Sequence, residues 1–92
     1  MPTKVAGKIV NKNTNISTTA AAIPTTAATG RISMAIKNNG SATIYIGDAS
    51  VTSSNGYPLA AGAEISLDVG EQVVVYGIAA SGTQDIRTLE GV

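Results

Sequence analysis

The sequence predicts an all-β protein, a small antiparallel β-sandwich or jelly-roll-like barrel with an extended N-terminal arm. Apolar and polar residues alternate with a period of two over residues 31–37 and 64–69. Clusters of glycine, asparagine and serine separate these stretches, as turns between strands require. No segment has a convincing helical period. The 92 residues make one domain, which we divide into an arm (residues 1–30) and a β-sandwich (residues 31–92).

Residues 1–30 are expected to be extended and to become ordered only on a surface. Lysines alternate with aliphatic residues up to Lys12, a pattern that fits either an edge strand or an extended arm. Residues 13–30 carry no charge and consist mostly of threonine and alanine. Pro24 and the threonine pairs on both sides of it argue against a helix longer than one turn.

The alternation continues on both sides of Asn38-Asn39-Gly40, which predicts a hairpin. A two-residue loop would place Ile44 and Ile46 on the polar face. A three-residue loop makes one face wholly apolar, because its pairs are Ile36 with Ala42, Met34 with Ile44 and Ile32 with Ile46. We therefore predict the three-residue loop, with Gly40 in the left-handed conformation that glycine adopts without strain.

The C-terminal half predicts three further strands. A long connection over residues 48–62 leads into the alternating strand at 64–69, and the last strand covers residues 84–90. Between them lies an unbroken apolar run of Val73, Val74, Val75 and Tyr76. Such a run is typical of a strand covered on both faces, here by a second sheet and by a neighbouring subunit. We therefore expect these four residues to form an oligomer interface.

Composition excludes several classes of chemistry. The chain has no histidine and no cysteine, so it cannot build a Ser-His-Asp or Cys-His nucleophile, a zinc site of the usual ligands, or a disulfide. The acidic residues Asp48, Asp68, Glu71 and Asp85 lack the spacing of a calcium loop. Pro2 could become an N-terminal amine base, but the βαβ unit of tautomerases that work this way is missing. We expect no enzyme activity, no cofactor and no metal.

The same composition predicts self-association. The chain has no Trp, no Phe and three Tyr, so its core must come from valine, isoleucine, leucine and alanine. A core of small side chains without disulfides is often completed by burial against other copies. We expect a homotrimer, or at least an assembly larger than a lone monomer.

Neither a membrane nor a nucleic acid is an expected partner. No apolar run approaches the roughly 20 residues of a membrane span. Polar residues follow the first lysines where a secretory signal would be apolar, so we expect synthesis in the cytoplasm. The tyrosines lie far from the N-terminal lysines in the sequence, whereas nucleic-acid binding favours interleaved basic and aromatic residues.

Charge is divided between the two halves of the sequence. Residues 1–40 carry five basic residues and no acid, and residues 41–92 carry six acids against Arg87 alone. A basic segment of this kind can lie on an acidic surface or on the acidic half of a neighbouring copy. Lys4, Lys8 and Lys12 are all even-numbered, so they project from one side of an extended arm. We predict that these three lysines bind an acidic surface.

Four motifs follow one another in residues 31–83. They are an arginine-led strand from Arg31, a Tyr-Ile-Gly strand end at residues 45–47, an Asn-Gly-x-Pro-Leu loop at residues 55–59 and a Val-Tyr-Gly-Ile strand at residues 75–78. In this order they resemble small virion modules of tailed bacteriophages, found in head decoration (cement or fibre) proteins and in some tail-associated proteins. The resemblance covers roughly residues 31–90.

This resemblance implies a non-enzymatic β-sandwich, commonly trimeric, that clamps neighbouring capsid subunits. The implied function is a capsid decoration protein that binds and stabilises the assembled head, with the major capsid protein as partner and the virion as location. The three N-terminal lysines would then contact the capsid. The alternative is a tail or fibre module that binds host glycans, which Tyr45 or Tyr57 exposed in loops would favour.

Overall fold

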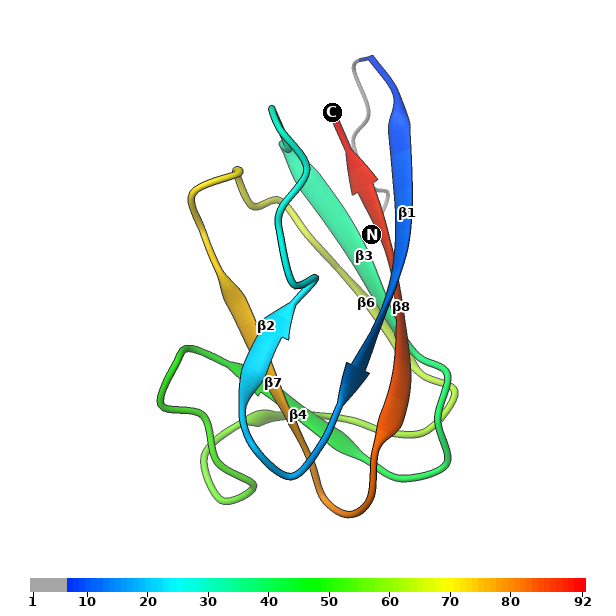
Figure 1. Ribbon diagram of the computed structural model, residues 1–92, viewed down its shortest axis with the longest axis vertical. Coiled ribbons are helices and arrows are strands. Elements are labelled where there is room, and N and C mark those ends of the chain that lie inside the picture. Colours follow the sequence, from blue (N-terminus) through cyan, green and yellow to red (C-terminus); the bar gives the residue numbers. More distant parts are fainter. Residues whose placement is uncertain (1–6) are drawn as a thin grey trace.

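The computed structural model describes residues 7–92, which form eight β-strands in two four-stranded sheets (Figure 1). The strands are β1 (Ile9–Ile16), β2 (Ala21–Ile23), β3 (Ser33–Asn38), β4 (Ile44–Gly47), β5 (Tyr57–Leu59), β6 (Glu64–Leu67), β7 (Val75–Ala79) and β8 (Gln84–Gly91). The first sheet has the order β1-β8-β3-β6 and the second the order β2-β7-β4-β5, and every neighbouring pair is antiparallel.

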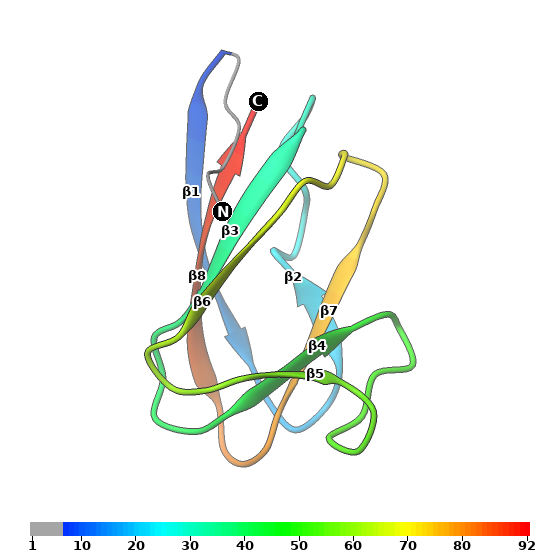
Figure 2. The same ribbon diagram turned by 180° about the vertical axis from the view of Figure 1, so that it is seen from behind.

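The strand order is that of a jelly roll. β1 pairs with β8, β2 with β7, β3 with β6 and β4 with β5, so the chain runs as one long antiparallel ribbon whose successive strand pairs alternate between the sheets. The two sheets face each other in both views, with the chain crossing between them at each end (Figure 2). The predicted all-β, antiparallel sandwich is confirmed.

The core lies between the sheets and is built from aliphatic side chains. Its buried members are Ile16, Ile23, Met34, Ile36, Ile44, Ile46, Leu59, Val75, Ala79 and Ile86. Their period-two spacing follows from strands that bury one face, because alternate side chains point to opposite sides of a sheet. None of the three tyrosines belongs to this cluster, so valine, isoleucine, leucine and alanine, with one methionine, supply the core.

The predicted hairpin at Asn38–Gly40 is wrong. β3 and β4 lie in different sheets, and residues 39–43 cross from one sheet to the other. Ile36 lies opposite Ile65 and Thr88 instead of Ala42. The apolar faces of the two strands meet across the core and not side by side, an arrangement that the same alternating sequence satisfies equally well.

Gly40 also has a different role from the one predicted. Its φ is not positive, whereas those of Gly30, Gly62 and Gly82 are. A Cβ at position 40 would lie 2.9 Å from Cβ of Gln84 and closer still to its Oε1. That oxygen accepts hydrogen bonds from the backbone of the crossing segment, so glycine is needed here for close approach.

The predicted arm is replaced, over residues 7–30, by two strands of the sandwich. β1 pairs with β8 along its whole length and β2 pairs with β7, so no boundary separates residues 30 and 31. Ile16 and Ile23 are fully buried in the core, which explains why this polar segment is ordered. Alternate positions from Asn11 to Asn15 face solvent. Lys4 lies outside the described residues. No helix within residues 7–92 is long and apolar enough to cross a membrane.

Candidate interaction surfaces

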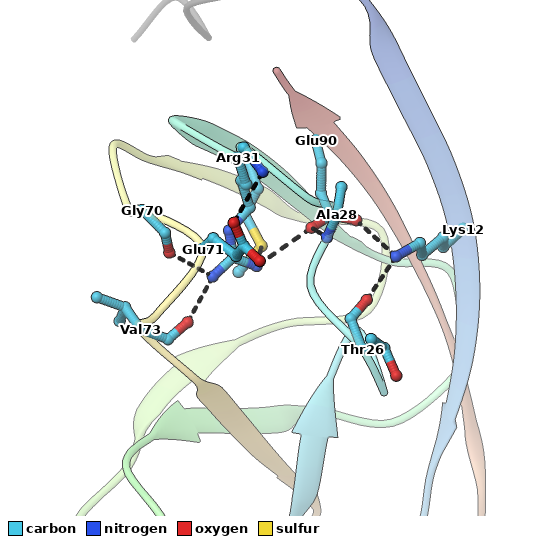
Figure 3. Close-up of polar contacts among 10 residues, drawn as sticks. Lys12, Thr26, Ala28, Arg31, Gly70, Glu71, Val73 and Glu90 are labelled. Atoms are coloured by element: carbon cyan, nitrogen blue, oxygen red, sulfur yellow. Dashed lines mark hydrogen bonds and ion pairs between the residues drawn. The ribbon is translucent and has the colours of Figure 1, made fainter.

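A buried carboxylate organises one end of the sandwich. Glu90 lies on the inward face of β8, and its side chain is fully buried. Its Oε2 accepts a hydrogen bond from the backbone N–H of Ala28 at 2.8 Å and another from Nη1 of Arg31 at 3.2 Å. The Lys12 ammonium lies 3.2 Å from Oε1, within ion-pair distance but outside hydrogen-bond geometry. Figure 3 shows these groups converging from β1, β8 and the segment before β3.

Arg31 extends the same network to the loop between β6 and β7. Its Nη2 donates to the carbonyl oxygen of Gly70 at 2.9 Å and to that of Val73 (Figure 3). Next to it, the N–H of Gly30 donates to Oε1 of Glu71 at 2.9 Å. These contacts tie β1 and β8 of the first sheet to the two loops that lead from one sheet to the other. The network stabilises the fold from within, because the Glu90 carboxylate is fully buried and cannot contact a molecule in solution.

The charge separation of the sequence is largely compensated by the fold. Lys12 and Arg31 come from the basic half, and both lie against Glu90 from the acidic half. Strand register also places Lys37 opposite Glu64. The two edges of the first sheet still differ in charge: β1 carries Lys12 and no acid, with Lys8 just before it, and β6 carries Glu64 and no base, with Asp68 just after it.

The predicted capsid-binding lysines are not equivalent in the structure. Lys8 is exposed, and its backbone exchanges hydrogen bonds with Val92. Lys12 is partly buried, and its ammonium also donates to the carbonyl oxygen of Thr26. An acidic partner could therefore engage Lys8 directly, whereas Lys12 would first have to leave Glu90.

The four predicted interface residues do not form one surface. Val73 and Val74 lie in the loop before β7 and are 48% and 52% exposed. Val75 is the first residue of β7 and belongs to the core. Tyr76 points to the opposite side of that strand and is half-buried. The unbroken apolar run therefore reflects a loop joined to a strand, not a strand covered on both faces.

Among the hollows on the surface of the sandwich, two lie along the sheets and edges discussed here. One, of about 350 Å³, lies on the outer face of the first sheet and is lined chiefly by polar side chains of β1, β3 and β8. The other, of about 270 Å³, opens between β5 and β6 and is lined by Ile46, Tyr57, Ile65, Ser66 and Leu67. The Tyr57 ring beside it is 62% exposed, the highest value among the large apolar side chains of residues 7–92.

Sequence reasoning did not identify the Glu90 network. A signal for it exists, since Gln84, Ile86, Thr88 and Glu90 alternate on the face of β8 that the core requires. An acid at such a position needs a basic partner, because burial of an unpaired charge is very unfavourable.

The second hollow and the exposed valines present apolar side chains at the surface. Within the described chain, no group of three or more acidic side chains is placed to hold a metal ion. Comparison of the sequence with protein-family models and with curated proteins found no match.

Proposed function

We propose that the protein is a bacteriophage virion structural protein that decorates the assembled head and stabilises it. The observation that carries the proposal is a pair of exposed valines on the loop between β6 and β7, which Arg31 holds by hydrogen bonds to its backbone. Val73 and Val74 are presented to solvent while Arg31 holds the carbonyl of Val73 and Glu90 holds Arg31. A rigid apolar projection of this kind suits a permanent contact with a preassembled protein surface.

The motif resemblance supports the same proposal through the fold. The Tyr-Ile-Gly motif ends β4, the Asn-Gly-x-Pro-Leu motif leads through β5, and the Val-Tyr-Gly-Ile motif begins β7, so all three occupy the second sheet. Their glycines have a packing role: a Cβ at Gly77 would clash with Ile23, and one at Gly56 with Tyr45. The motifs therefore contribute to the packing of the second sheet, and the loops would choose the capsid.

Lys8 and Lys4 would add electrostatic attraction to an acidic capsid. Single exposed ion pairs contribute only ~0.2–1 kcal/mol, so these lysines would strengthen binding without dominating it. Several copies acting together on one capsid would gain through effective concentration.

The test is co-sedimentation with purified heads that lack the protein and lack tails. Val73→Ser with Val74→Ser removes the apolar projection without altering the core, and we expect binding to fall by an order of magnitude or more. The matched control is Leu89→Ser, which changes another exposed aliphatic residue, on the outer face of β8. Lys4→Ala with Lys8→Ala should weaken binding and reduce its salt dependence. Absence of wild-type binding to heads would refute the proposal.

Removal of residues 1–30 is not a useful test of attachment. It would delete β1 and β2, and with them the buried Ile16 and Ile23. Loss of binding would then report unfolding.

One observation favours the glycan-binding alternative. Tyr57 is highly exposed beside a hollow, and sugar rings stack on exposed aromatic rings. The hollow is otherwise lined by aliphatic side chains and a single serine, which offers few partners for sugar hydroxyls. A glycan array with wild type and Tyr57→Ala decides between the two: signal that disappears with the tyrosine would support the tail-module function.

A further inference from the structure

The core is incompletely covered along one edge of the sandwich. Four apolar residues at alternating positions, Ala63, Ile65, Leu67 and Val69, pack against the core, but each is only partly buried. The opposing edge strand of the second sheet, β5, has three residues and leaves the apolar hollow beside Tyr57. Figure 2 shows β6 running upward from the turn that follows β5 toward the loop that leads to β7. This edge, residues 63–69 with Tyr57, is called the acidic edge below, because Glu64 and Asp68 lie along it.

The opposite edge of the same sheet is basic. It is formed by β1 and the residue before it, and it carries the exposed Lys8 and no acid, with Lys12 held further along the strand by Glu90. Ile9 is 59% exposed at the start of this strand, next to Lys8. We call residues 8–12 the basic edge.

Charge disfavours pairing of each edge with its own copy in the register that aligns its charged residues. A two-fold axis through Ser66 would bring Glu64 opposite Asp68 of the second copy, and like charges directly opposite each other on paired strands are destabilising. A two-fold axis through Val10 would likewise bring Lys8 opposite Lys12. The acidic and basic edges are complementary only to each other, which favours a head-to-tail contact.

We propose that copies of this chain associate head to tail, with Ile9 of one copy in the apolar hollow of the next and Lys8 facing Asp68. Such a contact covers the apolar residues that the isolated sandwich leaves partly open, which is the driving force for the association. Because each copy has one edge of each kind, a suitable rotation between copies closes the assembly into a ring. The inference concerns contacts between copies only and does not depend on binding to a capsid.

The experiment uses two variants of the full chain, each with one edge disabled. Lys8→Glu with Ile9→Ser disables the basic edge, and Tyr57→Ser with Asp68→Lys disables the acidic edge. All four side chains are exposed, so the core is unchanged, and circular dichroism verifies folding. Ser53→Lys, at an exposed position that belongs to neither edge, controls for an added charge.

Analytical ultracentrifugation over a range of micromolar to millimolar concentration gives the masses. Wild type and the Ser53→Lys control should sediment as a closed multiple of the 9.2 kDa chain, and each disabled variant as a monomer. An equimolar mixture of the two disabled variants should form a 1:1 dimer and nothing larger, because one intact contact remains. An interface between identical edges cannot give this result.

A charge exchange within one chain provides an independent check. Lys8→Glu combined with Asp68→Lys restores complementarity, and assembly should recover relative to either single change. The proposal is overturned by a monomeric wild type at every concentration. It is equally overturned by a mixture that stays monomeric, by disabled variants that assemble as wild type does, or by a charge exchange that recovers nothing.

Discussion

Substitution of Glu90 by Gln removes one charge from the buried network and leaves nearly everything else in place. Gln keeps the shape of the side chain and an oxygen that can accept from the N–H of Ala28. Arg31 then remains as a buried cation, since its side chain is 1% exposed. Breaking a buried ion pair by removing one partner is unfavourable by about 3–5 kcal/mol. Two carbonyl oxygens still accept hydrogen bonds from Arg31, so we expect the free energy of unfolding to fall by about 3 kcal/mol, the lower end of that range.

That loss is a large part of the stability of a domain of this size. The free energy of unfolding of a domain of this size is roughly 5–15 kcal/mol, so the variant stays folded at room temperature. Its melting temperature is expected to fall by roughly 12–24 °C. Urea unfolding followed by circular dichroism measures the difference in free energy of unfolding between the variant and wild type. If the slope of that free energy against urea concentration is unchanged, the two proteins expose the same surface on unfolding.

Lys12→Met is the matched control. This lysine lies against the same carboxylate, but its side chain is 31% exposed. Because exposed ion pairs contribute little, we expect the free energy of unfolding to fall by about 1 kcal/mol or less. In a double-mutant cycle, Arg31→Met combined with Glu90→Gln should be less destabilising than the sum of the single changes by about 2–3 kcal/mol. The reasoning is refuted if Glu90→Gln lies within 1 kcal/mol of wild type, or if the two single changes are additive.

Two further predictions concern the crossing segment and the outer face. Gly40→Ala should destabilise the fold by about 1–3 kcal/mol, because the added Cβ displaces the Gln84 oxygen from its two backbone donors; an unchanged urea midpoint would contradict it. Hydrogen bonds from the side chains of Arg87 and then Asn39 lower the pKa of Asp85 below its ordinary value of 3.8. A depressed pKa contributes stability above that ordinary value, and the contribution is lost as pH falls through the folded-state pKa. Arg87→Gln should therefore raise the pKa of Asp85 in a carbon-13 NMR titration, and an unmoved pKa would exclude the arginine as its cause.

Over residues 31–47 the alternating pattern predicted the buried residues, except that Ile32, placed on the same apolar face, is 38% exposed, but it did not predict which strands are neighbours. Met34, Ile36, Ile44 and Ile46 all face the core, as their spacing predicts. Whether β3 and β4 pair in one sheet or face each other across two depends on the connecting segment. Its geometry is fixed by the side chain of Gln84, which is distant in the sequence and bonds to the backbone of residues 41 and 42. Local pattern carries no information about such a contact.

The N-terminal segment was misjudged for a related reason. Its polar residues give little hydrophobic signal, yet Thr14 and Ile16 face inward and alternate with the outward Asn13 and Asn15. What orders the segment is the edge of β8, along which β1 pairs over eight residues. The hydrogen bonds of a sheet come from the backbone and are largely independent of side-chain type.

By itself the sequence determined that this protein is an all-β sandwich with an aliphatic core and without histidine or cysteine chemistry. Those properties follow from composition and from the period of two, both of which are local. Only the tertiary structure decided the jelly-roll order, the burial of Glu90 between Lys12 and Arg31, and the separation of a basic edge from an acidic one. Each of these depends on residues far apart in the chain, because charges and strand edges interact through space.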